Sequence, residues 1–365
     1  MKRVLIIGGY GNFGKYIAST LSKDPNLHII VAGRSLQKAQ KLALEIDADA
    51  LKLDISDDIK NSIEACNPNI VIHTSGPFQA QGYEVALACI HIGAHYIDLA
   101  DGREFVVGIE RLNEQAEAAE VLAVSGASSV PCLTSALVDH YELEFETLES
   151  LDYGITTAQK TTRGLATTAA ILGYTGKPFK TLLQGKNETI YGWQGLKARN
   201  YKDLGTRLLG NCDIPDLSIF PKRYPSLQTI RFYAGLELKF LHMALWMLSG
   251  LVRLGLIPRL EKLAPFMLRA SFLFDVFGSE DSGFHMQISG KDKAGNTKQI
   301  LFELTARKGD GPYIPCMPAI LLCKKIASGE LTKTGATPGV GLITKDDYLS
   351  ALSDLAINWT EEVTE

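Results

Sequence analysis

Residues 3–14 read RVLIIGGYGNFG, a short apolar run followed at once by a glycine-rich loop. The run predicts a buried strand, and residues 15–22 continue from the loop with a helical pattern. Gly9, Gly11 and Gly14 stand at G-x-G-x-x-G spacing. In a strand–loop–helix unit the first glycine permits a tight turn and the second lets the backbone approach a pyrophosphate. The third lets the helix pack close to the strand.

The start of this helix is the predicted phosphate site. Its first turn offers unpaired backbone N–H groups and the positive end of the helix dipole, so Asn12 and Phe13 join the glycines as candidate cofactor-binding residues. A second strand predicted over residues 28–32 makes the motif more specific. The alternative is a strand–helix turn that is tight without binding a dinucleotide.

Strand and helix signals alternate through about the first 125 residues, which is typical of an α/β fold. Further strands are predicted over residues 50–53, 70–74, 95–99 and 121–125. The intervening helices are predicted over residues 35–46, 57–65, 84–92 and 105–119. Six strands with crossover helices predict a doubly wound parallel Rossmann sheet in residues 1–130.

A second domain is predicted over residues 131–312. Its sequence is β-rich over residues 148–157, 284–289 and 299–307, and the last two of these segments predict a hairpin. We expect an α+β domain on a mixed or antiparallel sheet, with an apolar helical insertion at residues 236–277. Residues 313–365 are expected to be helical.

The composition excludes some classes of function. The 365 residues carry a formal net charge of −4 with a pI near 6.0, so nothing indicates nucleic-acid binding. The six cysteines are scattered without C-x-x-C or paired Cys/His spacing, which predicts reduced thiols and no metal site. Because the first residues lack the apolar core of a signal peptide, we expect a cytoplasmic protein.

Residues 240–257 and 263–277 are strongly apolar, which leaves three interpretations open. These segments are helices that are buried or form an oligomer, helices that lie at a membrane surface, or a membrane span. His242, Arg253 and Pro258 interrupt or end the first segment and argue against a span. We expect a homodimer, with peripheral membrane contact through residues 240–277 as an alternative.

The end of the second strand predicts which nicotinamide cofactor binds. NAD-binding folds usually place Asp or Glu here to hold the ribose 2′-OH, whereas this chain has Gly33, Arg34 and Ser35. An arginine and a hydroxyl can bind a 2′-phosphate, so the sequence favours NADP over NAD. Asp54, after the third strand, is a candidate for the adenine side, with a turn or capping role as the alternative.

Together the glycine loop, the segment VAGRSLQKAQKLA and the segment TSGPFQAQGYEVALACIHIGAHYIDLADGREF resemble the saccharopine dehydrogenase-like oxidoreductases. The resemblance covers roughly residues 1–130. It implies NADP in the first domain, a second domain with substrate contacts and a dimer surface, and C-terminal helices that pack back on the first domain. By position, the residues after the fourth strand lie where a nicotinamide ring would bind: Ser75, Gly76, Pro77 and Phe78.

The resemblance does not supply a substrate. Lysine-pathway members carry Asp-Pro-Gly after the sixth strand, and lipid-reductase relatives carry Asp-Ser-Val-Pro. Here residues 127–131 read ASSVP, so Ser128 stands where that aspartate would be. A serine is no carboxylate acid or base at neutral pH, which argues against saccharopine chemistry.

Three residues are candidates for catalysis. Asp98 and Asp101 flank the end of the fifth strand, where burial would let either act as a general acid, with loop capping as the alternative. Ser128 is included by its position. Tyr153 and Arg163 in the second domain are further candidates.

The function expected from the sequence is hydride transfer between NADP(H) and a small molecule with a C=N, C=O or activated C=C bond. No tyrosine is followed four positions later by lysine, which argues against a short-chain dehydrogenase. Two alternatives remain: a membrane-associated enoyl or lipid reductase, and a non-catalytic regulator that senses NADP.

Overall fold

The chain divides into two compact units, which are described separately. The computed structural model describes residues 1–364, apart from the side chain of Ala166. Unit 1 comprises residues 1–136 and 313–351, and unit 2 comprises residues 137–312 with the segment from residue 352 onward. The chain passes from unit 1 to unit 2 within α7 (Thr134–Tyr141).

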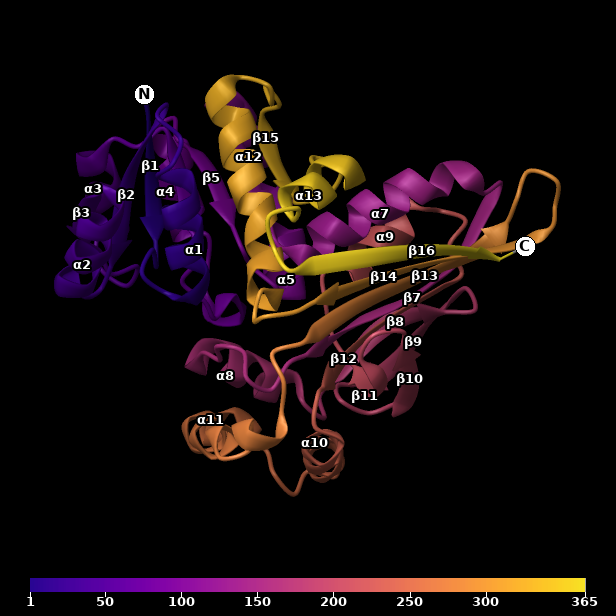
Figure 1. Cartoon of the computed structure of the whole chain (residues 1–365). Helices are drawn as coiled ribbons and strands as arrows, with labels where there is room; N and C mark the ends of the chain where they lie inside the picture. The colour runs from indigo at the N-terminus through magenta and orange to yellow at the C-terminus, as the bar shows by residue number, and fades with distance from the viewer. Residues whose placement is uncertain (365) are drawn as a thin grey trace. The chain divides into compact units, whose positions relative to one another are not determined.

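Unit 1 is built on a parallel seven-stranded sheet in the order β15-β6-β5-β4-β1-β2-β3 (Figure 1). Its strands are β1 (Lys2–Ile7), β2 (Leu27–Gly33), β3 (Asp49–Lys52), β4 (Ile70–His73), β5 (His95–Asp98), β6 (Leu122–Ser125) and β15 (Gly335–Pro338). The order of the first six strands is the doubly wound Rossmann order, so the predicted fold class is confirmed.

The helices of unit 1 connect these parallel strands. They are α1 (Asn12–Leu21), α2 (Leu36–Ile46), α3 (Ile59–Cys66), α4 (Glu84–His91), α5 (Arg103–Gly108), α6 (Asn113–Ala118), α12 (Met317–Ser328) and α13 (Lys345–Ala351). Central strand β1 is covered on both faces, since Val4, Leu5, Ile6 and Ile7 are at most 1% exposed. This explains its unbroken apolar run.

The single helix predicted over residues 105–119 is wrong in detail. The segment consists of α5, the 3₁₀ turn η2 (Ile109–Leu112) and α6. Two local causes are visible at the break. Gly108, a poor helix former, packs so closely that an added Cβ would lie 2.3 Å from the Tyr83 hydroxyl oxygen. That hydroxyl also donates to the carbonyl oxygen of Phe105 at 2.6 Å.

Unit 2 contains a mixed seven-stranded sheet in the order β10-β11-β12-β7-β13-β14-β16, together with the separate hairpin β8-β9. The strands are β7 (Thr147–Thr157), β8 (Pro178–Leu183), β9 (Lys186–Tyr191), β10 (Lys197–Tyr201), β11 (Gly205–Asn211), β12 (Thr229–Leu236), β13 (Ser282–Lys291), β14 (Thr297–Ala306) and β16 (Ile357–Thr364). Among the described strands of the seven-stranded sheet, β12 and β7 are the only pair that runs parallel, and the predicted hairpin is β13-β14.

The expectation that residues 313–365 are helical is wrong for the last part of the chain. Helices α12 and α13 belong to unit 1, but β16 pairs antiparallel with β14 in unit 2. The glutamates of residues 357–364 favour a helix by local propensity. The edge of β14 nevertheless supplies backbone hydrogen-bond partners, which cannot be inferred from the local sequence.

The apolar segment forms two separate helices in unit 2, α10 (Lys239–Arg253) and α11 (Ala264–Phe272), after which the chain reaches β13. Unit 2 also contains α8 (Leu165–Tyr174) and α9 (Asp216–Arg223). Within residues 1–364, every helix is too short or too polar to cross a bilayer.

Candidate functional site

The glycine-rich loop makes a tight turn at the carboxyl end of β1. The N–H groups of Gly8 and Gly9 donate to the carbonyl oxygen of Ala32, at 2.9 and 3.0 Å, and the Gly11 N–H donates to the Gly8 oxygen at 2.8 Å. A Cβ on Gly14 would lie 2.2 Å from that same Gly8 oxygen. Only glycine at position 14 therefore lets α1 approach the loop this closely.

The first turn of α1 is open to an anion. Gly11 occupies the N-cap position and is exposed, no side chain caps the helix, and its first turn holds no acidic residue. Asn12 is exposed and Phe13 is half-buried. The backbone N–H groups at this end are available to a phosphate group.

The corner after β2, formed by Gly33, Arg34 and Ser35, packs against the glycine loop. A Cβ on Gly33 would lie 2.5 Å from the ring of Tyr10, and the Tyr10 hydroxyl oxygen accepts the Ser35 N–H at 2.8 Å. The Ser35 hydroxyl oxygen caps α2 by accepting the N–H of Lys38 at 3.4 Å. Its own hydrogen is still free to donate.

Arg34 is exposed and forms no hydrogen bond or ion pair with residues 1–364. The corner thus presents a cation and a hydroxyl, with no carboxylate of its own. Tyr10 was not predicted as a site residue. Its only signal in the sequence is its position inside the glycine loop, because its contacts with Gly33 and Ser35 join segments more than 20 residues apart.

Asp54 lies next to this corner but serves the local turn. The N–H of Leu53 donates to the carbonyl oxygen of Gly33 at 3.0 Å, which brings the end of β3 beside the corner. The Asp54 carboxylate accepts the N–H of Ser56 at 3.1 Å. A contact with the adenine remains a prediction.

The loop after β4 borders the glycine loop. The Thr74 hydroxyl donates to the carbonyl oxygen of Ile7 at 2.9 Å, and a Cβ on Gly8 would lie 2.6 Å from the Ser75 hydroxyl oxygen. The side-chain amide of Gln81 donates to the carbonyl oxygen of Ser75 at 2.7 Å. Ser75 is therefore held at the carboxyl ends of β1 and β4, where the sheet order reverses.

Gly76 and Pro77 are exposed and joined by a cis peptide bond, whereas Phe78 is only 4% exposed. The Phe78 ring packs edge-on against His73, with ring centres 5.0 Å apart, and against Phe105 at 5.3 Å. Its side chain anchors the loop in the core. A contact between Phe78 and the cofactor would therefore have to be made by the backbone of Phe78.

Asp98 is completely buried at the end of β5. One carboxylate oxygen accepts the N–H groups of Gly126 and Ala100, at 2.8 and 2.9 Å, and the Ser125 hydroxyl at 3.0 Å. Burial raises the pKa of Asp98 to about 6, while these donors and the Tyr96 phenol act in the opposite direction. Asp98 thus ties the ends of β5 and β6 together.

The other two predicted catalytic residues are more accessible. Asp101 is exposed and accepts the side-chain amide of Gln79 at 3.0 Å. Ser128 is half-buried in extended backbone after β6, and its carbonyl oxygen accepts the N–H of Cys132 at 3.1 Å. Neither of these contacts joins Asp101 to Ser128.

The candidates in unit 2 are both engaged in structural contacts. Tyr153 is fully buried and donates to the Asp216 carboxylate at 2.9 Å. Arg163 donates to the Asp275 carboxylate at 2.6 Å and also contacts the carbonyl oxygen of Gln159. Neither is placed as a free catalytic group.

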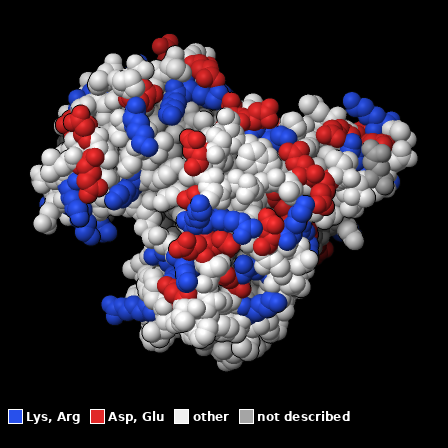
Figure 2. Space-filling view, viewed as in Figure 1, with Lys and Arg blue, Asp and Glu red and all other residues white. Residues whose placement is uncertain are grey.

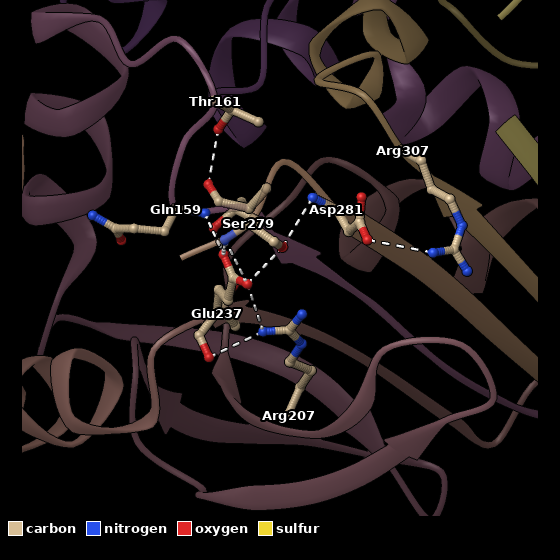
Figure 3. Close-up of polar contacts among 10 residues, drawn as sticks. Gln159, Thr161, Arg207, Glu237, Ser279, Asp281 and Arg307 are labelled. Carbon is tan, nitrogen blue, oxygen red and sulfur yellow. Dashed lines mark hydrogen bonds and ion pairs between the residues drawn. The ribbon is translucent and has the colours of Figure 1, made fainter. Parts of the chain in front are cut away.

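Gln159 belongs to a polar network centred on Glu237 (Figure 3). The Glu237 carboxylate accepts the N–H of Gln159 at 2.7 Å and the N–H and hydroxyl of Ser279 at 3.0 and 2.6 Å, and Arg207 lies 3.6 Å away. Burial raises the pKa of Glu237, but these donors outweigh it and hold the pKa below its ordinary value. The network fixes the chain just before α10 and just before β13.

Among residues 1–364, no group of three His, Cys, Asp or Glu side chains is arranged to hold a metal ion. Within residues 1–364, the best-supported candidate site is the one for a dinucleotide cofactor. We call it the cradle, and it is formed by the glycine loop, the corner after β2 and the loop after β4.

The amino-terminal part of the chain is similar to a known cofactor-binding domain. Residues 4–124 match the family model of the saccharopine dehydrogenase NADP-binding domain. No curated protein sequence matches the chain.

Two solved structures share the fold over nearly the full chain. Apo saccharopine dehydrogenase (L-Glu forming) from Saccharomyces cerevisiae has 14% sequence identity and a TM-score of 0.75, with 100% of each chain covered. Homospermidine synthase from Legionella pneumophila, in complex with NAD, has 11% identity and a TM-score of 0.59, with 98% of this chain and 91% of that chain covered. At these identities the similarity shows the fold alone.

Proposed function

We propose that the protein is an NADP-dependent oxidoreductase, because residues 4–124 match the family model of the saccharopine dehydrogenase NADP-binding domain. It transfers a hydride between NADP(H) and a small molecule that carries a C=N, C=O or activated C=C bond. The cofactor, when bound, supplies or accepts the hydride, and the protein binds and orients the reactants.

The observation that supports NADP is the corner formed by Gly33, Arg34 and Ser35. Arg34 is exposed and has no hydrogen-bond or ion-pair partner among residues 1–364, and Ser35 keeps a hydroxyl hydrogen to donate. A 2′-phosphate takes charge-assisted hydrogen bonds from such groups, whereas NAD selection relies on a carboxylate.

The remaining residues of the cradle have complementary roles in the proposal. The N–H groups of Asn12 and Phe13 in the first turn of α1 bind the pyrophosphate, and Gly14 keeps α1 close enough to present them. Ser75, Gly76 and Pro77 border the nicotinamide end. Asp98, Asp101 and Ser128 stay candidates for proton transfer or substrate contact, with Asp98 also holding the strand ends.

A regulator that binds NADP without turnover is the second candidate. It is favoured because the sequence offers no obvious acid/base pair. Turnover of NADPH with any imine, ketone or enoyl substrate would exclude this candidate.

The test is a calorimetric titration of the purified protein with NADPH and NADH. We expect NADPH to bind the more tightly. Arg34→Asp should weaken NADPH binding by about 2–3 kcal/mol, or roughly 30- to 150-fold, because it removes one charge-assisted contact and adds repulsion. It should leave NADH binding within about threefold of the wild type.

Lys41→Asp is the matched control, since Lys41 is an exposed lysine farther along α2. It makes the same change of charge away from the corner and should have little effect. Gly11→Val should abolish binding of both cofactors. Equal losses for NADPH and NADH in Arg34→Asp would contradict the NADP assignment.

A further inference from the structure

Unit 2 presents an apolar surface to solvent on α10, α11 and the turns beside them. Six of the strongly exposed large side chains there are Met247, Leu254, Leu256, Phe266, Leu273 and Phe277, which are 56 to 74% exposed. We call these six residues the apolar face. Figure 2 shows the region where Figure 1 places α10 and α11 as largely white, with basic side chains at its margin.

Folding of unit 2 does not account for this face. The inner side of α10 packs into unit 2 through buried residues, including Leu245, Ser249 and Val252. A surface helix normally turns a polar side outward. On α10 the outward side instead carries the exposed apolar residues Phe240, Met247 and Leu251.

The apolar face is held firmly in place. The Glu237 network fixes the chain before α10 and after α11, as described above. The side-chain amide of Gln159 also donates to the carbonyl oxygen of Ser271 and to the carboxylate of Asp275, at 2.8 and 3.0 Å. A surface anchored in this way pays little ordering cost on binding.

The charge of the same segment is opposite to that of the chain as a whole. Residues 239–277 contain five basic and two acidic residues, while the chain carries a net charge of −4. The acidic Asp275 is neutralised by Arg163. The basic residues that form no ion pair with residues 1–364 are Lys239, Arg253, Arg259, Lys262 and Arg269.

We propose that the apolar face docks on the surface of an anionic phospholipid bilayer. The apolar side chains enter the headgroup boundary, and the basic side chains contact lipid phosphates. A second copy of the chain fits less well, because a two-fold axis through this face would bring the same cations together. The proposal does not depend on the assignment of NADP chemistry.

The test is flotation of the full chain with vesicles of phosphatidylcholine alone and of phosphatidylcholine with phosphatidylglycerol. We expect binding to the anionic vesicles, weakening by about fivefold for each basic residue removed. Arg259→Gln with Lys262→Gln should therefore lower partitioning by roughly 25-fold. Leu254→Ser with Phe266→Ser should lower it at least about tenfold, because apolar burial adds to the attraction.

Matched controls lie elsewhere in unit 2. Leu143 is 75% exposed and Lys293 lies in the exposed turn between β13 and β14, so Leu143→Ser and Lys293→Gln should bind vesicles as the wild type does. Circular dichroism and thermal unfolding report whether each variant is folded. Absence of flotation, or equal loss in the controls, would overturn the proposal. A dimer in sedimentation that Leu254→Ser with Phe266→Ser dissociates would also overturn it, and would assign the face to a second copy.

Discussion

The buried side chain of Asp98 both joins the ends of two strands through hydrogen bonds and has a raised pKa. Its carboxylate gathers donors from the loop after β5 and the end of β6, and burial still leaves its pKa raised to about 6. A pKa near 6 would suit a side chain that donates a proton to the substrate. The Asp98 side chain is completely buried, however, so a substrate cannot reach it in this structure. Desolvation also raises the pKa of Asp101, against the lowering effect of the Gln79 amide, whereas Ser128 carries no carboxyl group.

The raised pKa makes stability depend on pH in a defined direction. Between about pH 4 and pH 6 the folded state holds a proton on Asp98 that the unfolded state has released, so the free energy of unfolding falls as pH rises. A shift from 3.8 to about 6 corresponds to about 3 kcal/mol. Asp98→Asn keeps an oxygen to accept the same donors and should flatten this dependence.

Urea unfolding at pH 4, 5, 6 and 7 measures the effect. Asp54→Asn is a matched control, because Asp54 is half-exposed at the end of the neighbouring strand β3. An unchanged pH dependence in Asp98→Asn would show that Asp98 does not retain a proton in the folded state.

The segment from α10 to α11 depends on contacts at its two ends. Glu237 receives donors from Gln159 and Ser279 and pairs with Arg207, whose side chain is 10% exposed. These partners come from β11, from the loop after β7 and from the residues before β13. The apolar helices are thus attached through one carboxylate.

Glu237→Gln should lower the free energy of unfolding by about 2–3 kcal/mol at pH 7, because it leaves Arg207 without its ion-pair partner. Since the pKa of Glu237 is lowered, the contribution is present at neutral pH and disappears as pH falls below the ordinary range of glutamate. Thermal unfolding and limited proteolysis of residues 239–277 measure it. Exposed Glu188 in β9 provides the control Glu188→Gln, and similar losses in the two variants would exclude a special role for the network.

The two units draw on both ends of the chain. Unit 1 includes residues 313–351, which add β15 to the Rossmann sheet. Unit 2 includes β16, near the carboxyl end of the chain. Neither sheet is completed by a single continuous stretch of sequence.

Deletion of residues 357–365 should therefore affect the units differently. Unit 2 should lose at least about 2 kcal/mol of stability, since β14 loses its pairing with β16 and becomes an open edge of the sheet. NADPH affinity should stay within about threefold, because the cradle lies in unit 1. Calorimetric titration and urea unfolding separate the two effects, and an equal loss of both would contradict the division.

By itself the sequence determined six of the seven strands of the Rossmann sheet, the position of the glycine loop and the absence of a carboxylate after β2, but not strand β15. These features follow from local pattern, because a parallel strand covered on both faces is continuously apolar and a phosphate-binding turn needs glycine at fixed spacing. Only the tertiary structure decided the pairing of β16 with β14, the break near Gly108, the contact of Tyr10 with Ser35 and the complete burial of Asp98. Each depends on groups brought together from distant parts of the chain, whose packing and hydrogen bonds override local preference.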